Sequence, residues 1–309
     1  MGFLKWLEGI RNPFFDFIFS AITMLGEETV FMAVAIVVFW CINKKDGYYI
    51  LSIGFVGTII NQFLKLAFRI PRPWVKDPSF TIVESARAEA TGYSFPSGHT
   101  QSSVGTFASL TWLAKRKWMK GIFIACCILV PFSRLYLGVH TPLDVFTSVG
   151  IALLLVLILK PILDMTEEKP FVMYIFLGFM LVLAISFVLF VELYSFPADI
   201  DMHNYQSGLK NAYTLLGALI GMIIAYPIER KYINFDVSGK WYTQLIKVGG
   251  GLLLTLGVKA GLKPILNLIF NGSNVAHAIR YGLVVIFAVI VWPLTFPLIK
   301  KLENKFKKG

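Results

Sequence analysis

Long apolar runs are the feature that most constrains how this chain can fold. Nine runs reach or approach the roughly 20 residues that an α-helix needs to cross a bilayer. They lie at about 29–42, 48–68, 100–114, 118–131, 143–159, 171–191, 212–226, 246–270 and 276–299. Of the 309 residues, 56% are hydrophobic and only 15% are charged, and the mean hydropathy is +0.69, which is typical of membrane proteins. We therefore expect an all-α, polytopic transmembrane helical bundle with roughly nine crossings, several of them short.

The N-terminal segment, residues 1–27, begins differently, with an amphipathic stretch that ends at Asn12-Pro13. Its apolar residues alternate with charged ones, as on a helix that lies in the plane of a membrane surface. The apolar residues are Leu4, Trp6, Leu7 and Ile10, and the charged ones are Lys5, Glu8 and Arg11. A signal peptide is the alternative, but Glu8 lies in the first turns and no small-residue cleavage site follows an apolar core. We predict an N-terminal interfacial helix.

Basic residues gather in every second loop between the apolar runs. They are Lys44, Lys45, Lys115, Arg116, Lys117, Lys120, Lys160, Lys169, Arg230, Lys231, Lys240, Lys300, Lys301, Lys305, Lys307 and Lys308. Short loops rich in Lys and Arg stay in the cytoplasm, so we expect a cytoplasmic C-terminus and extracytoplasmic intervening loops. Although the net charge is +11, the basic residues form no aromatic-interleaved face of the kind that binds nucleic acid. We expect no nucleic-acid partner.

The first of three notable segments on the expected outer side contains Lys65 and Arg72. They follow the end of an apolar run, where Pro71 and Pro73 remove backbone donors and end the helix. Cations in this position can bind an anion together. Alternatively, they reach for lipid headgroups, as Lys and Arg at helix ends commonly do.

The second segment, Pro96-Ser97-Gly98-His99, begins the next apolar run. Ser97 is suited to cap the helix, and Gly98 lets the backbone approach a ligand closely. The free amide groups of the first helical turn attract an anion, and His99 would lie beside that anion. By itself, however, the tetrapeptide is more simply interpreted as a helix cap with a polar neighbour.

The third segment contains Arg134, His140 and Asp144. Thr141-Pro142 is a typical helix start, so Asp144 lies about one turn after His140 and can accept a hydrogen bond from its imidazole. A His and an Asp at this spacing are also common as a structural pair. Together, the three segments supply fixed cations, a nucleophile and a proton donor, which are the groups that phosphoryl transfer requires. This chemistry needs no metal ligands, and we expect no cofactor.

The ordered pattern Lys-x6-Arg-Pro, Pro-Ser-Gly-His, Ser-Arg-x5-His-x3-Asp resembles the type 2 phosphatidic acid phosphatase superfamily, which shares its core with vanadium-dependent haloperoxidases. Every signature position is occupied, and the resemblance covers roughly residues 28–160. It implies an acid-phosphatase-like helical core, which we place at 28–165, in a membrane-bound lipid phosphate phosphatase that needs no metal.

The resemblance also implies roles for the residues. His140 is the expected nucleophile, Asp144 holds it in the productive tautomer, and His99 is the general acid that protonates the leaving oxygen and later activates water. The expected ligands of the phosphate oxygens are Lys65, Arg72, Ser97, Gly98 and Arg134. The residues alone do not tell which histidine attacks.

The implied substrate is a lipid phosphate or diphosphate of the undecaprenyl diphosphate, phosphatidylglycerophosphate or phosphatidic acid class. We expect hydrolysis through a vanadate-sensitive phosphohistidine step at the outer face of a bacterial plasma membrane. A glucose-6-phosphatase-like sugar phosphatase and a lipid phosphotransferase stay open as enzymatic alternatives. The non-enzymatic alternative is an anion or lipid transporter or channel that binds its cargo at the cationic cluster. An internal repeat with broken helices would favour it, and the sequence shows no convincing repeat.

The remaining residues, 166–309, carry no motif, and we predict additional C-terminal transmembrane helices of unknown role. Lys259 and Lys263 lie in a long apolar run but close enough to its outer end to reach the headgroups. The glycines at 249–251 and 257 permit close helix packing. This leaves lipid transport or a homodimer open as roles for this half.

Overall fold

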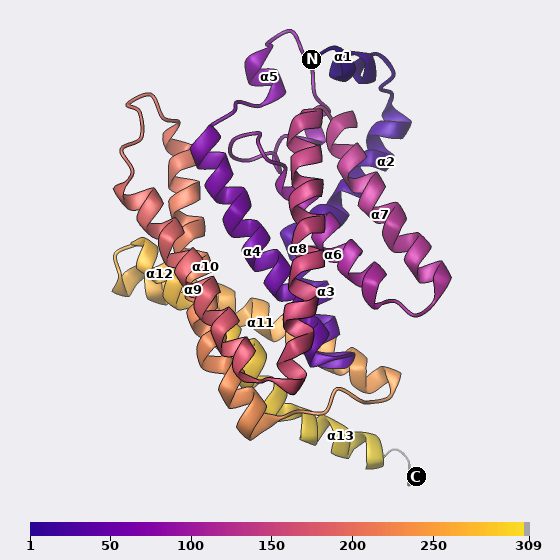
Figure 1. The fold of residues 1–309 in the computed structure, drawn as a ribbon, viewed down its shortest axis with the longest axis vertical. Coiled ribbons are helices and arrows are strands. Elements are labelled where there is room, and N and C mark those ends of the chain that lie inside the picture. Colours follow the sequence, from indigo (N-terminus) through magenta and orange to yellow (C-terminus); the bar gives the residue numbers. More distant parts are fainter. Residues whose placement is uncertain (306–309) are drawn as a thin grey trace. The chain divides into compact units, whose positions relative to one another are not determined.

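The computed structural model describes residues 1–305, and no strand occurs among them (Figure 1). The helices are α1 (Gly2–Gly9), α2 (Pro13–Thr23), α3 (Glu28–Cys41), α4 (Lys44–Phe68), α5 (Pro73–Lys76), α6 (Gly98–Leu113), α7 (Lys117–Tyr136), α8 (Pro142–Glu168), α9 (Phe171–Leu193), α10 (Met202–Ile228), α11 (Trp241–Ile269), α12 (Asn274–Ile286) and α13 (Phe296–Lys305). Short turns are η1 (Met24–Gly26), η2 (Glu84–Ala86), η3 (Glu229–Ile233), η4 (Phe287–Val291) and η5 (Pro293–Thr295). The predicted all-α membrane fold is confirmed, whereas the basic residues Lys307 and Lys308 lie outside the described part.

Within residues 1–305, seven helical segments are long and apolar enough to cross a membrane. An eighth is reached if α2–η1 and α3, which meet at a bend of 50°, count as one span. Every predicted apolar run is helical, but nine crossings are too many, because only seven or eight segments are long and apolar enough to cross a membrane. The reason is length: the 14 residues of α3 and the 16 of α6 extend only about 21 and 24 Å, against roughly 30 Å of hydrocarbon.

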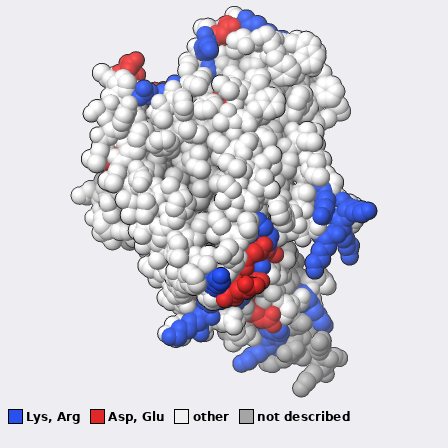
Figure 2. All heavy atoms as spheres, viewed as in Figure 1, with Lys and Arg blue, Asp and Glu red and all other residues white. Residues whose placement is uncertain are grey.

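The contacts within the chain divide it into two compact units. Unit 1 comprises residues 1–35, 49–164 and 196–208, and unit 2 comprises 36–48, 165–195 and the residues from 209 onward. The units interleave along the sequence because α3, α4, α8 and α10 each contribute one end to each unit. Our sequence-based boundaries after residues 27 and 165 stay a prediction. Much of the surface visible in Figure 2 carries no charge, as expected for helices that face lipid.

In unit 1, the N-terminal helix α1 packs onto the loop that precedes α6. Leu4 and Leu7 are buried against a cluster that includes Phe80, Ile82, Leu137 and Val139. At the polar side of the helix, Glu8 accepts a hydrogen bond of 2.8 Å from the backbone N–H of Thr81. Trp6 stays exposed. The helix is amphipathic as predicted, but part of its apolar face covers protein, and it holds the loop in place.

The approach of α4 to α6 places two of the sequence segments side by side. A Cβ atom on Gly57 of α4 would lie 2.8 Å from Nε2 of Gln101 on α6, so glycine makes room for the amide side chain. Because α4 ends near Lys65 and Ser97 caps the start of α6, the close contact brings the end of one helix to the start of the other.

In unit 2, α10 and α12 approach each other through small residues. A Cβ atom on Gly217 would lie 1.9 Å from the carbonyl oxygen of Ala278, and one on Gly221 would lie 2.5 Å from that of Gly282. Such backbone proximity is typical of helix pairs in membranes. Since the opposing atoms belong to backbone, they cannot move aside as a side chain would.

We expect Gly217→Ala to destabilise the protein by about 1–3 kcal/mol, the usual cost of forcing an extra methyl group into a packed interface. The thermal unfolding midpoint of the purified protein in detergent measures this. Gly178→Ala on α9 is the matched control, because a Cβ atom there meets nothing within 4 Å. Equal midpoints for both variants would show that α10 and α12 are not packed as described.

Candidate active site

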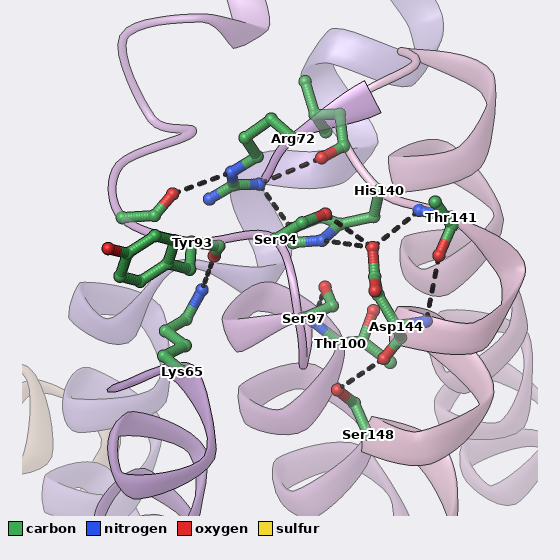
Figure 3. Close-up of polar contacts among 12 residues, drawn as sticks. Lys65, Arg72, Tyr93, Ser94, Ser97, Thr100, His140, Thr141, Asp144 and Ser148 are labelled. Atoms are coloured by element: carbon green, nitrogen blue, oxygen red, sulfur yellow. Dashed lines mark hydrogen bonds and ion pairs between the residues drawn. The ribbon is translucent and has the colours of Figure 1, made fainter. Parts of the chain in front are cut away.

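The three sequence segments meet in unit 1 at the ends of its helices (Figure 3). Lys65 comes from the last turn of α4, Arg72 immediately precedes α5, and Arg134 lies in the last turn of α7. Their side chains are buried, with exposed fractions of 8%, 6% and 0%. Three cations are thus withdrawn from water in one place, which is unfavourable unless an anion accompanies them.

Arg72 joins the loop before α6 to the turn between α7 and α8. Its guanidinium donates hydrogen bonds to the carbonyl oxygens of Thr91 (2.6 Å), Gly92 (3.0 Å) and Val139 (3.0 Å). Lys65 donates similarly to the carbonyl oxygen of Tyr93. Both cations are therefore held in position by backbone carbonyls of the same loop.

His140 lies in this turn, and its two ring nitrogens have different neighbours. Nε2 is 2.9 Å from Nη1 of Arg72. Because arginine can only donate, Nε2 must be the acceptor and the proton of the neutral ring belongs on Nδ1. Nδ1 lies 3.5 Å from Oδ2 of Asp144. The lone pair of Nε2 is therefore directed toward the cations and is engaged by Arg72, so Arg72 must release it before Nε2 can act as a nucleophile.

Asp144 is fixed more tightly by other groups than by the histidine. Its Oδ2 accepts hydrogen bonds from Oγ of Ser94 at 2.6 Å and from the backbone N–H of Thr141 at 2.7 Å. The carboxylate is 1% exposed, and its Oδ2 lies beside Nδ1, the ring nitrogen that is not near Arg72 (Figure 3), without a hydrogen bond between them. From this fixed position the negative charge of Asp144 favours a proton on Nδ1.

Several buried donors of the site have no acceptor among the described residues. Nη1 of Arg134 donates to Oγ1 of Thr23 at 2.7 Å, but its Nε and Nη2 atoms lack a hydrogen-bond partner, as does Nε2 of His99. Leaving such groups unpaired costs about 1–3 kcal/mol each. At the start of α6, Oγ of Ser97 accepts a hydrogen bond from the N–H of Thr100 at 3.4 Å. The other backbone N–H groups of this first turn, which includes Gly98, point out of the N-terminal end of the helix, where an anion can bind.

The charge of the site acts on His140, which lies between the α7 and α8 spans. Its pKa is lowered well below the ordinary value of 6.5, first by burial and then by nearby Arg72, Arg134 and Lys65, with His99 adding to the effect. The imidazole is therefore neutral in the free site. All of the predicted residues gather around one position in unit 1, while their individual roles stay a prediction.

The structure also reveals site residues that the motifs do not include. Ser94 and Thr23 bond to Asp144 and Arg134, as described above. Asn61 on α4 and Gln101 on α6 are 3% and 5% exposed, and their amide atoms have no partner within the described chain. Each is one helical turn from a predicted residue, since Asn61 precedes Lys65 and Gln101 follows Ser97 by four positions. That spacing is a usable sequence signal, whereas Thr23 offers none.

No group of three or more His, Cys, Asp or Glu side chains in the described range is arranged to hold a metal ion. The donors at the site are nitrogen cations and amides, with Asp144 committed to Ser94 and Thr141. This set of groups matches an oxyanion such as phosphate.

Family models match two parts of the chain. The model of the PAP2 superfamily matches residues 46–168, which include every predicted site residue. A second model, the transmembrane extension of PAP2 superfamily phosphatases, matches residues 213–305. No solved structure shows significant similarity.

Relatives with curated names are lipid phosphatases. A probable sphingosine-1-phosphate phosphatase of Dictyostelium discoideum is 31% identical, over 48% of this chain and 38% of its own length. An undecaprenyl-diphosphatase of Bacillus subtilis is 30% identical, over 37% of this chain and 55% of its own. The phosphatidylglycerophosphatase B of the same organism is 28% identical, over 49% and 76%. The chain thus spans less than two thirds of the first two relatives.

The family models confirm the resemblance that the three motifs indicate. The geometry explains this resemblance, because the matched region folds so that the three motifs lie around one buried site. The chain belongs to the PAP2 superfamily, with a PAP2 domain followed by the transmembrane extension found in phosphatases of this superfamily.

Proposed function

We propose that the protein is an integral-membrane, metal-independent phosphatase that hydrolyses a lipid phosphate or diphosphate through a phosphohistidine. The observation that carries the proposal is the burial of Lys65, Arg72 and Arg134 around the neutral imidazole of His140. A site that only binds an anion needs the cations. It has no need of a histidine placed between an arginine and a fixed carboxylate, as His140 is, and this favours chemistry over transport.

In the first step, Nε2 of His140 attacks phosphorus, the bond from phosphorus to the leaving oxygen breaks, and His99 gives its proton to that oxygen. In the second step, His99 takes a proton from water, the resulting hydroxide attacks the phosphohistidine, and inorganic phosphate leaves. Lys65, Arg72 and Arg134 neutralise the charge on the non-bridging oxygens in both transition states. His99 must therefore enter the cycle protonated, which the charge of a bound phosphate favours.

The substrate class follows from the membrane setting and from the relatives. A site at the ends of membrane-crossing helices lies at the depth of lipid headgroups. The relatives are named for sphingosine-1-phosphate, undecaprenyl diphosphate and phosphatidylglycerophosphate, which share a phosphate group on a membrane lipid. We propose a substrate of this shared chemistry.

The proposal places the site on the extracytoplasmic face. In unit 1, the loop between α6 and α7 carries Lys115 and Arg116, and Lys117 begins α7. It lies at the opposite end of α6 from Ser97, which caps the helix at the site. Since basic loops stay in the cytoplasm, the site belongs on the other side, and by the same rule the C-terminus is cytoplasmic.

We expect His140→Ala to abolish phosphate release, because no nucleophile remains. Release of inorganic phosphate from phosphatidic acid, phosphatidylglycerophosphate and undecaprenyl diphosphate in detergent micelles is the measurement, and acid-labile phosphate on the protein reports the intermediate. His203→Ala, which changes an exposed histidine, is the control and should behave as the unmodified protein. Full activity of His140→Ala would eliminate the mechanism.

Metal removal should leave turnover intact, since the cations of the proposed site are side chains. Phosphate release is compared before and after dialysis against a chelator, and then with orthovanadate, which resembles five-coordinate phosphorus and should inhibit. Loss of activity with the chelator, restored by a divalent metal, would contradict the proposed chemistry.

The lowered pKa of His140 predicts a pH effect on stability in the absence of phosphate. Below pH 6.5, the unfolded chain binds a proton at this side chain that the folded chain does not, so the free energy of unfolding falls as the pH drops. In His140→Gln this contribution is absent, and the thermal unfolding midpoint should fall less steeply between pH 6.5 and 5. Parallel pH profiles of the two proteins would refute the assignment.

A further inference from the structure

A second group of basic side chains lies in unit 2, where α10, α11 and α12 meet. We call it the extension cluster; its members are Lys210 on α10, Lys259 and Lys263 on α11, and His277 and Arg280 on α12. None of these residues belongs to the motifs of the PAP2 domain. All of them lie in the part of unit 2 that begins at residue 209.

Arg280 is the centre of the extension cluster. It is 5% exposed, its Nη2 atom is 3.0 Å from Nδ1 of His277, and its Nε atom is buried without a hydrogen-bond partner in the described chain. The guanidinium carbon lies 5.2 Å from the ring centroid of Tyr281. A buried arginine in a membrane helix is costly unless it is paired, and it commonly marks a functional site.

The other members add positive charge without a compensating carboxylate. Lys259 lies 5.3 Å from the ring centroid of Tyr281, the same ring that Arg280 contacts. The charges that act on His277 are those of Arg280, Lys210 and Lys263, and all of them are positive. Across residues 1–305, no Asp or Glu forms a salt bridge with any cation of the extension cluster.

The backbone holds this arrangement in place. The contacts of Gly217 with Ala278 and of Gly221 with Gly282 fix α10 against α12, so the start of α10 with Lys210 lies beside the first turns of α12. Ser273, at the N-terminus of α12, makes no side-chain cap. The positive end of that helix dipole therefore adds to the charge of the cluster.

Interaction with headgroups at the membrane surface explains lysines that are exposed, such as Lys210 and Lys263. It does not explain Arg280, whose side chain is enclosed by protein and still has a free donor. A fixed guanidinium with an unpaired N–H, in a region that also carries the positive charges of Lys210 and Lys263, is suited to recognise a phosphate group.

We propose that the extension cluster binds the phosphate group of an anionic ligand, at a second site that carries out no hydrolysis. His277 faces the Arg280 guanidinium instead of an orienting carboxylate, so it lacks the partner that His140 has in Asp144. The shared chemistry is a phosphate monoester, supplied either by a membrane lipid or by free phosphate.

The test counts lipids bound to the full chain. His140→Ala protein, which cannot turn over its substrate, is purified in phosphatidylcholine nanodiscs and titrated with phosphatidic acid, and bound lipid is measured by native mass spectrometry. Adding Arg280→Gln should remove one phosphatidic acid per chain or weaken its binding about tenfold, the effect of losing one charge-assisted contact. Lys231→Gln, which changes an exposed lysine in η3, just beyond the C-terminal end of α10, is the matched control and should change nothing.

Because Arg280→Gln removes a buried side chain, a double Lys210→Gln, Lys263→Gln variant serves as a second probe. It alters exposed positions only and should weaken the same binding event. Titration with inorganic phosphate in pure phosphatidylcholine nanodiscs separates the two ligand sources. If millimolar phosphate raises the thermal unfolding midpoint of the protein, and does so only when Arg280 is present, the ligand is free phosphate. Unchanged binding of both ligands in both variants would overturn the proposal.

Phosphate release by chains that retain His140 tells the two proposals apart. Loss of lipid binding in Arg280→Gln together with measurable hydrolysis separates the second site from the catalytic one. Conversely, binding that depends on Arg280 in a protein without hydrolysis would support the extension cluster and contradict the proposed function alone.

Discussion

The contact between Arg72 and His140 is the interaction on which the site depends. The guanidinium reaches the imidazole at 2.9 Å while it also holds three backbone carbonyls. It thereby defines the tautomer of the histidine, joins two segments that are 68 residues apart, and keeps positive charge where phosphate would bind. The helices of unit 1 serve to bring these groups together and to exclude water from them.

Much of the fold and of the site is predictable from sequence, because both depend on local patterns. Each apolar run forms a helix, and the proline and serine positions correctly mark where helices begin and end. Lys65, His99 and Asp144 occur in short motifs at helix ends, so the positions of the helices bring them into one place. The spans that fail the length criterion, α3 and α6, are the runs where the pattern is shortest.

The remaining features depend on contacts between helices that no local pattern encodes. Thr23 bonds to Arg134 from 111 positions away, and nothing in its neighbourhood marks it as a site residue. From the sequence alone, Lys263 is simply a surface lysine. Its relation to Arg280 emerges only from the packing of α11 against α12 and from the short distance between α10 and α12. Burial of a charge is a tertiary property, and it is what distinguishes a binding group from a solvated one.

The loop carbonyls that hold Arg72 and Lys65 have a consequence for the catalytic cycle. Arg72 gives four of its five N–H donors to Thr91, Gly92, Val139 and His140, and Lys65 gives one of its three to Tyr93. One N–H of Arg72 and two of Lys65 are therefore left for the oxygens of a phosphate. A phosphate can thus bind to cations that the loop already holds in place, without first displacing those carbonyls.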